Sequence, residues 1–132
     1  MYPPSIRTVV HCLCLEPNYL QHYEHAGITV PSARPRSALC PYMPLVLEKK
    51  LAASVNILPK ASSLYFWKGE IEEATEILLL IKTRTSKVPI LSSYIRSVHP
   101  FEIPEVFSLA MDQGDVHYLK WLEDSMEVDR VG

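Results

Sequence analysis

The sequence has 132 residues, of which 48% are hydrophobic, so it can form at most one ordinary domain with a buried core. The formal net charge is −2 and the basic residues are dispersed, which argues against nucleic acid or an anionic membrane surface as the main partner. Three cysteines without a secretory signature predict a reduced, intracellular and cytoplasmic setting. The apolar run Ile6–Leu15 is too short to cross a bilayer, so we expect no direct membrane insertion.

The first third of the chain is rich in proline. Seven of the eleven prolines lie within residues 1–44, where they prevent regular helix and remove backbone donors from any sheet. We therefore expect residues 1–43 to be an atypical extension that is largely loop. Threonine, valine and cysteine suit an extended backbone, so a strand over residues 6–15 is the exception we predict.

From Pro44 onward the chain is patterned. Leu45, Leu51 and Ala52 have near-helical spacing, and Pro44 is acceptable in a first helical turn. Ser54–Trp67 is rich in β-branched and aromatic residues and predicts a long strand bent at Pro59. The turn that ends this strand is predicted at Lys68-Gly69-Glu70.

The next segment, Ile71–Thr83, is ambiguous from its residues alone. Its glutamate, alanine and leucine content favours a helix. In contrast, Ile77–Ile81 is apolar on every side, which is typical of a central strand buried on both faces.

Three further elements are predicted toward the end of the chain. Ser86–Val98 is an amphipathic helix with Ser86 as its N-cap, and its inner face comprises Val88, Leu91, Ile95 and Val98. Pro104–Met111 is a short strand. Val116–Met126 is a last helix, with Trp121 in the core.

Several short sequence motifs within residues 48–123 resemble those of a known protein family. They are Glu48-Lys-Lys-Leu-Ala-Ala53, Ser63-Leu-Tyr65-Phe-Trp67-Lys-Gly69, Val98-His-Pro-Phe-Glu102 and Tyr118-Leu-Lys-Trp121. In this order and spacing they resemble the CutA divalent-cation tolerance family. The resemblance implies an α+β, ferredoxin-like fold, with helices on one face of an antiparallel sheet. It moves Ile71–Thr83 from helix to strand, and it implies a CutA-like domain over residues 44–126 with a flexible tail at 127–132.

The same resemblance shows that the ends of the chain differ from the family. Members open with a strand that ends in Cys-Pro-Asn, and only Cys40-Pro41 echoes that motif here. In a ferredoxin-like sheet this first strand lies between the third and fourth, whose inner edges would otherwise lose their partners. The family strand is thus missing or substituted. Either residues 6–15 supply the substitute, or the domain is poorly stable.

His99, Glu102 and Glu105 are the candidate metal ligands. An imidazole with two carboxylates can bind one divalent ion, and the imidazole favours copper or zinc. The structural alternative is that His99 ends a helix while both carboxylates are solvated. The resemblance links this region to copper and to a cleft between subunits, so the cofactor expected is copper or another divalent metal, not tightly bound.

A second cluster, His11-Cys12-x-Cys14, contains soft ligands that would share a face of a strand. For these cysteines the interpretation as small buried hydrophobic residues is favoured.

Tyr65, Phe66 and Trp67 are candidates for a subunit interface, because three consecutive aromatic residues cannot all face one side of a strand. Ordinary core packing is the alternative. The resemblance implies a homotrimer that pairs sheet edges between subunits.

No catalytic constellation is readable, so the protein is predicted not to be an enzyme. The function implied is metal tolerance through divalent metal binding by a trimer. The alternatives are a scaffold or anchoring role for a protein partner such as acetylcholinesterase, and a small-molecule sensor of the PII type.

Overall fold

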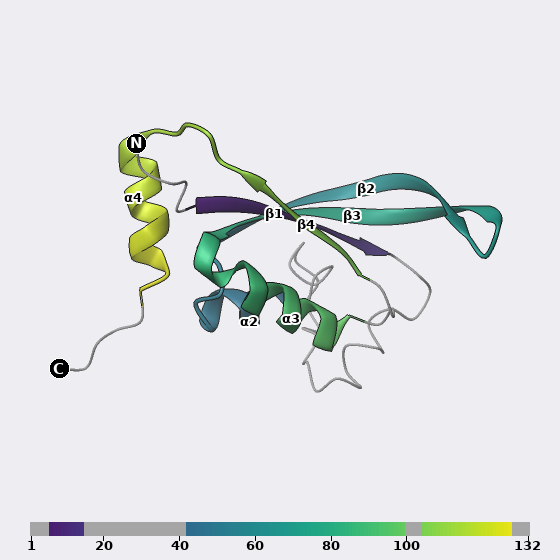
Figure 1. Ribbon diagram of the computed structural model, residues 1–132, viewed down its shortest axis with the longest axis horizontal. Helices are drawn as coiled ribbons and strands as arrows, with labels where there is room; N and C mark the ends of the chain where they lie inside the picture. Colours follow the sequence, from purple (N-terminus) through teal and green to yellow (C-terminus); the bar gives the residue numbers. More distant parts are fainter. Residues whose placement is uncertain (1–5, 15–41, 100–103, 128–132) are drawn as a thin grey trace.

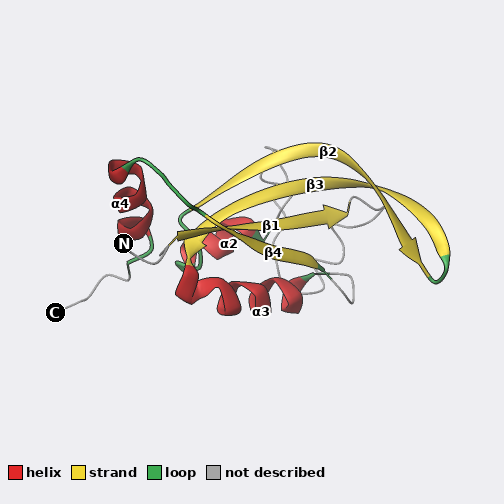
Figure 2. Ribbon diagram, turned by 45° about the horizontal axis from the view of Figure 1, so that its top comes forward, coloured by secondary structure: helices red, strands yellow, loops and turns green. Residues whose placement is uncertain are grey.

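The computed structural model describes residues 6–14, 42–99 and 104–127. These residues form a four-stranded antiparallel sheet with helices α2 and α3 on one of its faces and α4 at one end (Figures 1 and 2). In chain order, the elements are β1 (Ile6–Cys14), α2 (Met43–Glu48), β2 (Ser54–Trp67), β3 (Glu70–Arg84), α3 (Val88–Val98), β4 (Glu105–Ala110) and α4 (Val116–Ser125). The predicted α+β class with an antiparallel sheet is confirmed.

Strand β1 occupies an inner position of the sheet, whose order is β2-β3-β1-β4. In the register of the two ladders, Val9 lies opposite Ile81 of β3 on one side and opposite Ser108 of β4 on the other. The backbone groups on both edges of β1 therefore have partners, as buried strands require. The folded unit thus includes Ile6–Cys14 as the substituted strand, together with the patterned part of the chain.

The main core lies between the sheet and the helices α2 and α3. Along β3 the fully buried side chains alternate, and Ile77, Leu79 and Ile81 all face this core. Leu78 and Leu80 point to the opposite face and are only half-buried. The expectation that this run is buried on both faces is therefore wrong for the described residues, because no helix covers the second face there.

Helix α3 begins later than its sequence predicts. A 3₁₀ turn over Thr85–Lys87 precedes it, and Lys87 is the N-cap residue, so the assignment of Ser86 as the cap is wrong. The predicted inner face is confirmed: Leu91 and Ile95 are fully buried, and the two valines at the ends pack against the core. None of the described helices is long and apolar enough to span a membrane.

Helix α2 is also shorter than the pattern indicates. It ends at Glu48, and Lys50 follows in the left-handed region with φ 59°. Leu51 and Ala52 therefore lie outside the helix, although both still pack into the core. A single helical turn is enough here because burial, and not helix propensity, holds the segment.

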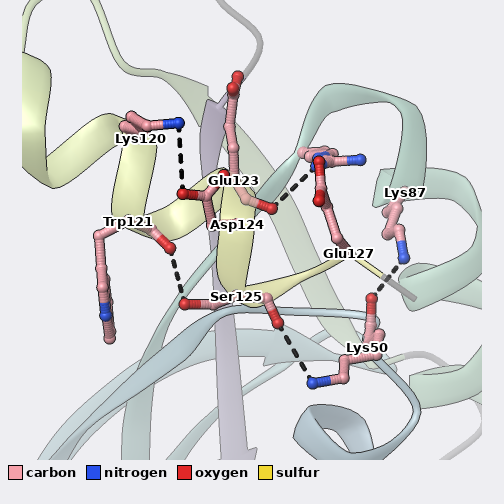
Figure 3. Close-up of polar contacts among 9 residues, drawn as sticks. Lys50, Lys87, Lys120, Trp121, Glu123, Asp124, Ser125 and Glu127 are labelled. Atoms are coloured by element: carbon pink, nitrogen blue, oxygen red, sulfur yellow. Dashed lines mark hydrogen bonds and ion pairs between the residues drawn. The ribbon is translucent and has the colours of Figure 1, made fainter. Parts of the chain in front are cut away.

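Helix α4 is fixed at both ends. The Asp115 side chain accepts hydrogen bonds from two backbone amides of the first turn. At the other end, Arg84 donates to the Glu123 carbonyl at 2.8 Å and Lys50 to the Ser125 carbonyl at 3.4 Å, as Figure 3 shows for Lys50. Lys50 thus gives the Ser125 carbonyl a partner at the helix end, and Arg84 adds a second hydrogen bond to the Glu123 carbonyl, which also accepts from the Met126 amide.

Only one side of α4 is buried. Leu122 packs fully inside, together with Met126 and Ile6. Trp121 is 54% exposed and stacks on Tyr118 on the outer side, so the prediction that this tryptophan belongs to the core is wrong.

Strands β2 and β3 form a long hairpin with the predicted bounds of β2. The register shifts between Leu58 and Ala61, which is where Pro59 was expected to bend the strand. At the tip, Lys68 and Gly69 both have positive φ, the backbone of a tight hairpin turn that favours glycine. Within the described part of the chain, residues 62–75 pair only with each other, because the described ladder between β1 and β3 ends at the pair Cys14 and Glu76.

Among the described residues, His11 is the histidine that is fully buried in the core. Its Nδ1 donates to the Glu105 carbonyl at 2.9 Å, and its Nε2 accepts from the hydroxyl of buried Tyr42. Burial lowers the pKa of His11 to about 4, with the neighbouring imidazole of His99 acting in the same direction. The ring is therefore neutral at pH 7, with its proton on Nδ1.

Replacing Val9 tests the inner position of β1. Val9 is fully buried, so Val9→Ala should lower the free energy of unfolding by about 2 kcal/mol, through lost burial and the cavity left behind. The matched control is Val116→Ala, at a side chain that is 75% exposed, which should stay within about 0.5 kcal/mol of wild type. Equal losses for the two variants in urea unfolding would contradict the inner placement.

His11 should make stability depend on pH. The ordinary pKa of 6.5 applies to the unfolded chain and the folded value is about 4, so the unfolded chain takes up a proton first as the pH falls. Stability is then fully present above pH 6.5 and declines by about 3 kcal/mol toward pH 4. Denaturant unfolding in EDTA measures this decline. It should shrink in His11→Asn and persist in His117→Gln, a change at an exposed histidine of α4.

Candidate functional site

Three potential metal ligands meet on the face of the sheet opposite to α2 and α3. The Cys12 thiol and one carboxylate oxygen each from Glu76 and Glu105 all lie within 4.8 Å of one another. They come from β1, β3 and β4, three neighbouring strands. Cys12 lies directly opposite Glu105, and Glu76 lies opposite Cys14, two residues further along β1. The pairing register therefore assembles the cluster from distant parts of the sequence.

The cluster holds a protonated thiol. Burial raises the pKa of Cys12 to about 12, and hydrogen bonding with Glu105 and the negative charges of Glu105 and Glu76 act in the same direction. Glu76 is almost fully buried, and its carboxylate accepts a hydrogen bond from the Ser63 hydroxyl at 2.8 Å. A cation bound here would replace the thiol proton and offset two adjacent carboxylates.

The donor set fits a divalent transition metal. A thiolate and two carboxylates at bonding distances of about 2.0–2.3 Å from one ion lie roughly 3.5 Å apart, so the present spacing requires only a small closure. Sulfur favours copper or zinc over magnesium and calcium. Glu105 is exposed, which leaves one side of the cluster accessible for entry or for a further ligand.

The predicted ligands His99, Glu102 and Glu105 are not brought together among the described residues. Glu105 belongs to the cluster, and Glu102 lies outside the described residues. His99 follows the last residue of α3, and its ring lies 5.3 Å, centroid to centroid, from that of His11 on the helix-covered face. The sheet thus lies between His99 and the Cys12 thiol, and the site predicted from His99, Glu102 and Glu105 stays a prediction.

Glu76 is the ligand that sequence reasoning missed. The available signal was the carboxylate of Glu76, directly before the apolar run Ile77–Ile81. A charged group next to a buried strand usually has a charged partner or binds a metal. Cys12 was interpreted as a small buried hydrophobic residue, whereas the structure shows a half-buried thiol between two carboxylates. The residues that lie opposite Cys12 on the two neighbouring strands depend on the pairing register, which spacing alone does not give, and this hid the cluster.

The predicted interface residues Tyr65, Phe66 and Trp67 lie near the tip of the β2–β3 hairpin. We call residues 62–75 the hairpin arm, which reaches away from the rest of the sheet in Figure 1. Phe66 is 77% exposed, and both faces of the arm carry exposed large apolar side chains, which are Leu64, Tyr65, Phe66, Trp67 and Ile71. The structure therefore does not place these aromatic residues in the described core.

Comparison with known proteins gives consistent results. The model of the CutA1 divalent ion tolerance protein family matches residues 28–125. The Protein CutA homolog of Xenopus laevis is 57% identical over 79 residues, which are 60% of this chain and 52% of that protein. The Divalent-cation tolerance protein CutA of Thermus thermophilus is 39% identical over 98 residues, 74% of this chain and 92% of that protein. The chain spans about half the length of the animal relatives it matches.

Solved structures show the same fold over almost the whole chain. The divalent cation tolerance protein of Thermus thermophilus superposes with a TM-score of 0.68 at 29% identity, covering 91% of this chain and 97% of that one. CutA1 from Oryza sativa gives a TM-score of 0.71 at 26% identity, covering 95% and 96%. Family match, sequence identity and fold agree, and this chain therefore belongs to the CutA1 divalent ion tolerance protein family.

Proposed function

We propose that the protein acts in metal tolerance by binding a divalent metal ion without catalysis. The observation that carries the proposal is the cluster of Cys12, Glu76 and Glu105, the one group of three or more such ligands among the described residues. Its relatives are named divalent-cation tolerance proteins. Soft and hard donors in one cluster select copper or zinc, and copper is the metal that we propose.

The geometry favours reversible binding. The cluster supplies three ligands, one of them exposed, and the ion must displace a proton from a thiol whose pKa is raised to about 12. Both features lower affinity relative to a closed four-ligand site. A protein that takes up metal in excess and releases it needs such a site. A free thiol also requires a reduced compartment, in agreement with the intracellular setting expected from the cysteines.

We propose in addition that the protein is a homotrimer whose subunits contact one another through the hairpin arm. The arm is two-stranded over residues 62–75, and an isolated two-stranded ribbon is marginally stable in water. Its exposed aromatic and aliphatic side chains offer a second chain the apolar area that an interface needs. The same surface supports the alternative scaffold role, in which a different protein binds there.

Metal titration distinguishes the two candidate ligand sets. Cys12→Ser and Glu76→Gln should each weaken Zn²⁺ or Co²⁺ binding more than about tenfold, because each removes a ligand. The matched control Glu72→Gln changes an exposed carboxylate on the same strand and should have no effect. Calorimetry under nitrogen on freshly reduced protein, in a buffer without thiol or phosphine reductant, measures these affinities, with a Cu²⁺ competition for metal preference.

The same titration tests His99. A loss of affinity in His99→Ala together with full affinity in Cys12→Ser would replace the present cluster with the set His99, Glu102 and Glu105. Unchanged affinity in all of these variants would refute metal binding at either site.

Light scattering tests the trimer. The wild-type protein should have three times the mass of one chain, and Phe66→Ser should shift it toward the monomer, because it places a hydroxyl in the apolar contact. The control Val116→Ser alters an equally exposed apolar side chain on α4 and should remain trimeric. A monomeric wild-type protein would contradict the proposed assembly. Capture of another protein by the arm in the presence of a chelator would then favour the scaffold.

A further inference from the structure

The buried imidazole of His11 and the thiol of Cys12 lie back to back across the sheet. Consecutive residues of a strand point to opposite faces, so the His11 ring enters the helix-covered core while the thiol points to the metal cluster. One peptide unit joins the two side chains. The orientation of the imidazole and that of the thiol are therefore coupled through the backbone of β1.

His11 also contacts the main chain of a second ligand residue. Its Nδ1–H donates to the carbonyl of Glu105 at 2.9 Å, while the carboxylate of Glu105 lies in the cluster. Glu105 is the first residue of β4, which lies at the edge of the sheet and, among the described strands, pairs only with β1. The end of an edge strand opens locally more easily than the middle of a sheet. The hydrogen bond from His11 therefore stabilises the position of Glu105 where strand pairing is weakest.

The Glu105 carbonyl determines which nitrogen of His11 donates, because a carbonyl can only accept and the ring proton must therefore lie on Nδ1. The Tyr42 hydroxyl then donates to Nε2 and holds the other side of the ring. Tyr42 is fully buried and directly precedes α2, so the contact connects the helix layer to the metal side of the sheet. The third ligand is held independently, since Glu76 accepts a hydrogen bond from Ser63 of β2.

We propose that His11 and Tyr42 are positioning residues of the metal cluster, which hold Cys12 and Glu105 at ligand spacing through the Tyr42–His11–Glu105 hydrogen-bond chain. This inference rests on the proposed metal-binding function. In many metal sites, groups that do not touch the ion orient the ligands that do. Here His11 would act on Glu105 through its backbone carbonyl, and on Cys12 as the preceding residue of the same strand.

A role in stability alone predicts a different outcome. If the pair only satisfied polar groups in the core, its removal would lower the free energy of unfolding and leave the metal site of the folded protein unchanged. Metal affinity and the spectrum of the bound ion, both measured on folded protein, therefore separate positioning from stability.

The test uses Co²⁺ as the probe, because its thiolate charge-transfer band reports Cys12 ligation. Tyr42→Phe keeps the ring and removes the hydroxyl, and His11→Leu removes both hydrogen bonds. Each should weaken Co²⁺ binding about tenfold, with a shifted or weakened band. His11→Asn keeps an amide donor near the position of Nδ1 and should stay within about threefold of wild type.

Thr83→Val is the matched control. It removes a different hydrogen bond of a buried side-chain hydroxyl, that from Thr83 to the Leu51 carbonyl, at the C-terminal end of β3. It should lower stability while leaving Co²⁺ affinity and the band unchanged. Circular dichroism before each titration confirms that a variant is folded, and Tyr42→Phe, which keeps its ring, serves as the deciding variant if His11→Leu does not fold.

The outcomes separate the two proposals. Cys12-dependent Co²⁺ binding in wild type, with unchanged affinity and spectrum in both Tyr42→Phe and folded His11→Leu, would overturn the positioning role and leave metal binding intact. Loss of affinity in the control Thr83→Val as large as in Tyr42→Phe would also overturn it. Absence of any Cys12-dependent band in wild type would overturn the proposed function, and the positioning role with it.

Discussion

The pairing of β1 with strands on both of its sides is the constraint on which the rest of the structure depends. Residues Ile6–Cys14 satisfy the inner edges of β3 and β4, and they supply Val9 to the core. Without this strand, β3 and β4 would have unpaired backbone groups in the middle of the sheet, next to the buried core. The candidate metal site depends on the same pairing, because β1 carries Cys12 and lies between the strands that carry the carboxylates of Glu76 and Glu105.

The sheet divides the chemistry of the molecule between its two faces. On the covered face, His11, Tyr42 and His99 form a polar group within apolar packing, in which burial keeps the His11 ring neutral. On the other face, a protonated thiol lies between two carboxylates, and the surrounding apolar side chains of β3 are only half-buried. Low dielectric thus keeps the imidazole uncharged on one side, while partial solvation permits an ion to approach on the other.

Much of the fold could be predicted from the sequence, and the failures have physical causes. The bounds of β2 follow from its β-branched and aromatic content, and the inner face of α3 from its periodicity. Helix propensity misleads in β3, where burial against the core overrides the preference of glutamate, alanine and leucine. The register hid Glu76 from the candidate site, since the pairing of strands far apart in sequence leaves no local pattern. Stacking on Tyr118 explains the exposed Trp121, which composition alone assigns to a core.

The order of the strands along the chain has a kinetic consequence. The hydrogen bond between His11 and Glu105 closes a separation of 94 residues, whereas the β2–β3 hairpin closes through a two-residue turn. The hairpin can therefore form early on the ribosome, while β1, although synthesised before it, must wait for β4 to emerge before both of its edges are matched. During that interval the edge of β1 that later pairs with β4 stays without its partner, and a chaperone that shields this edge would raise the yield of native protein.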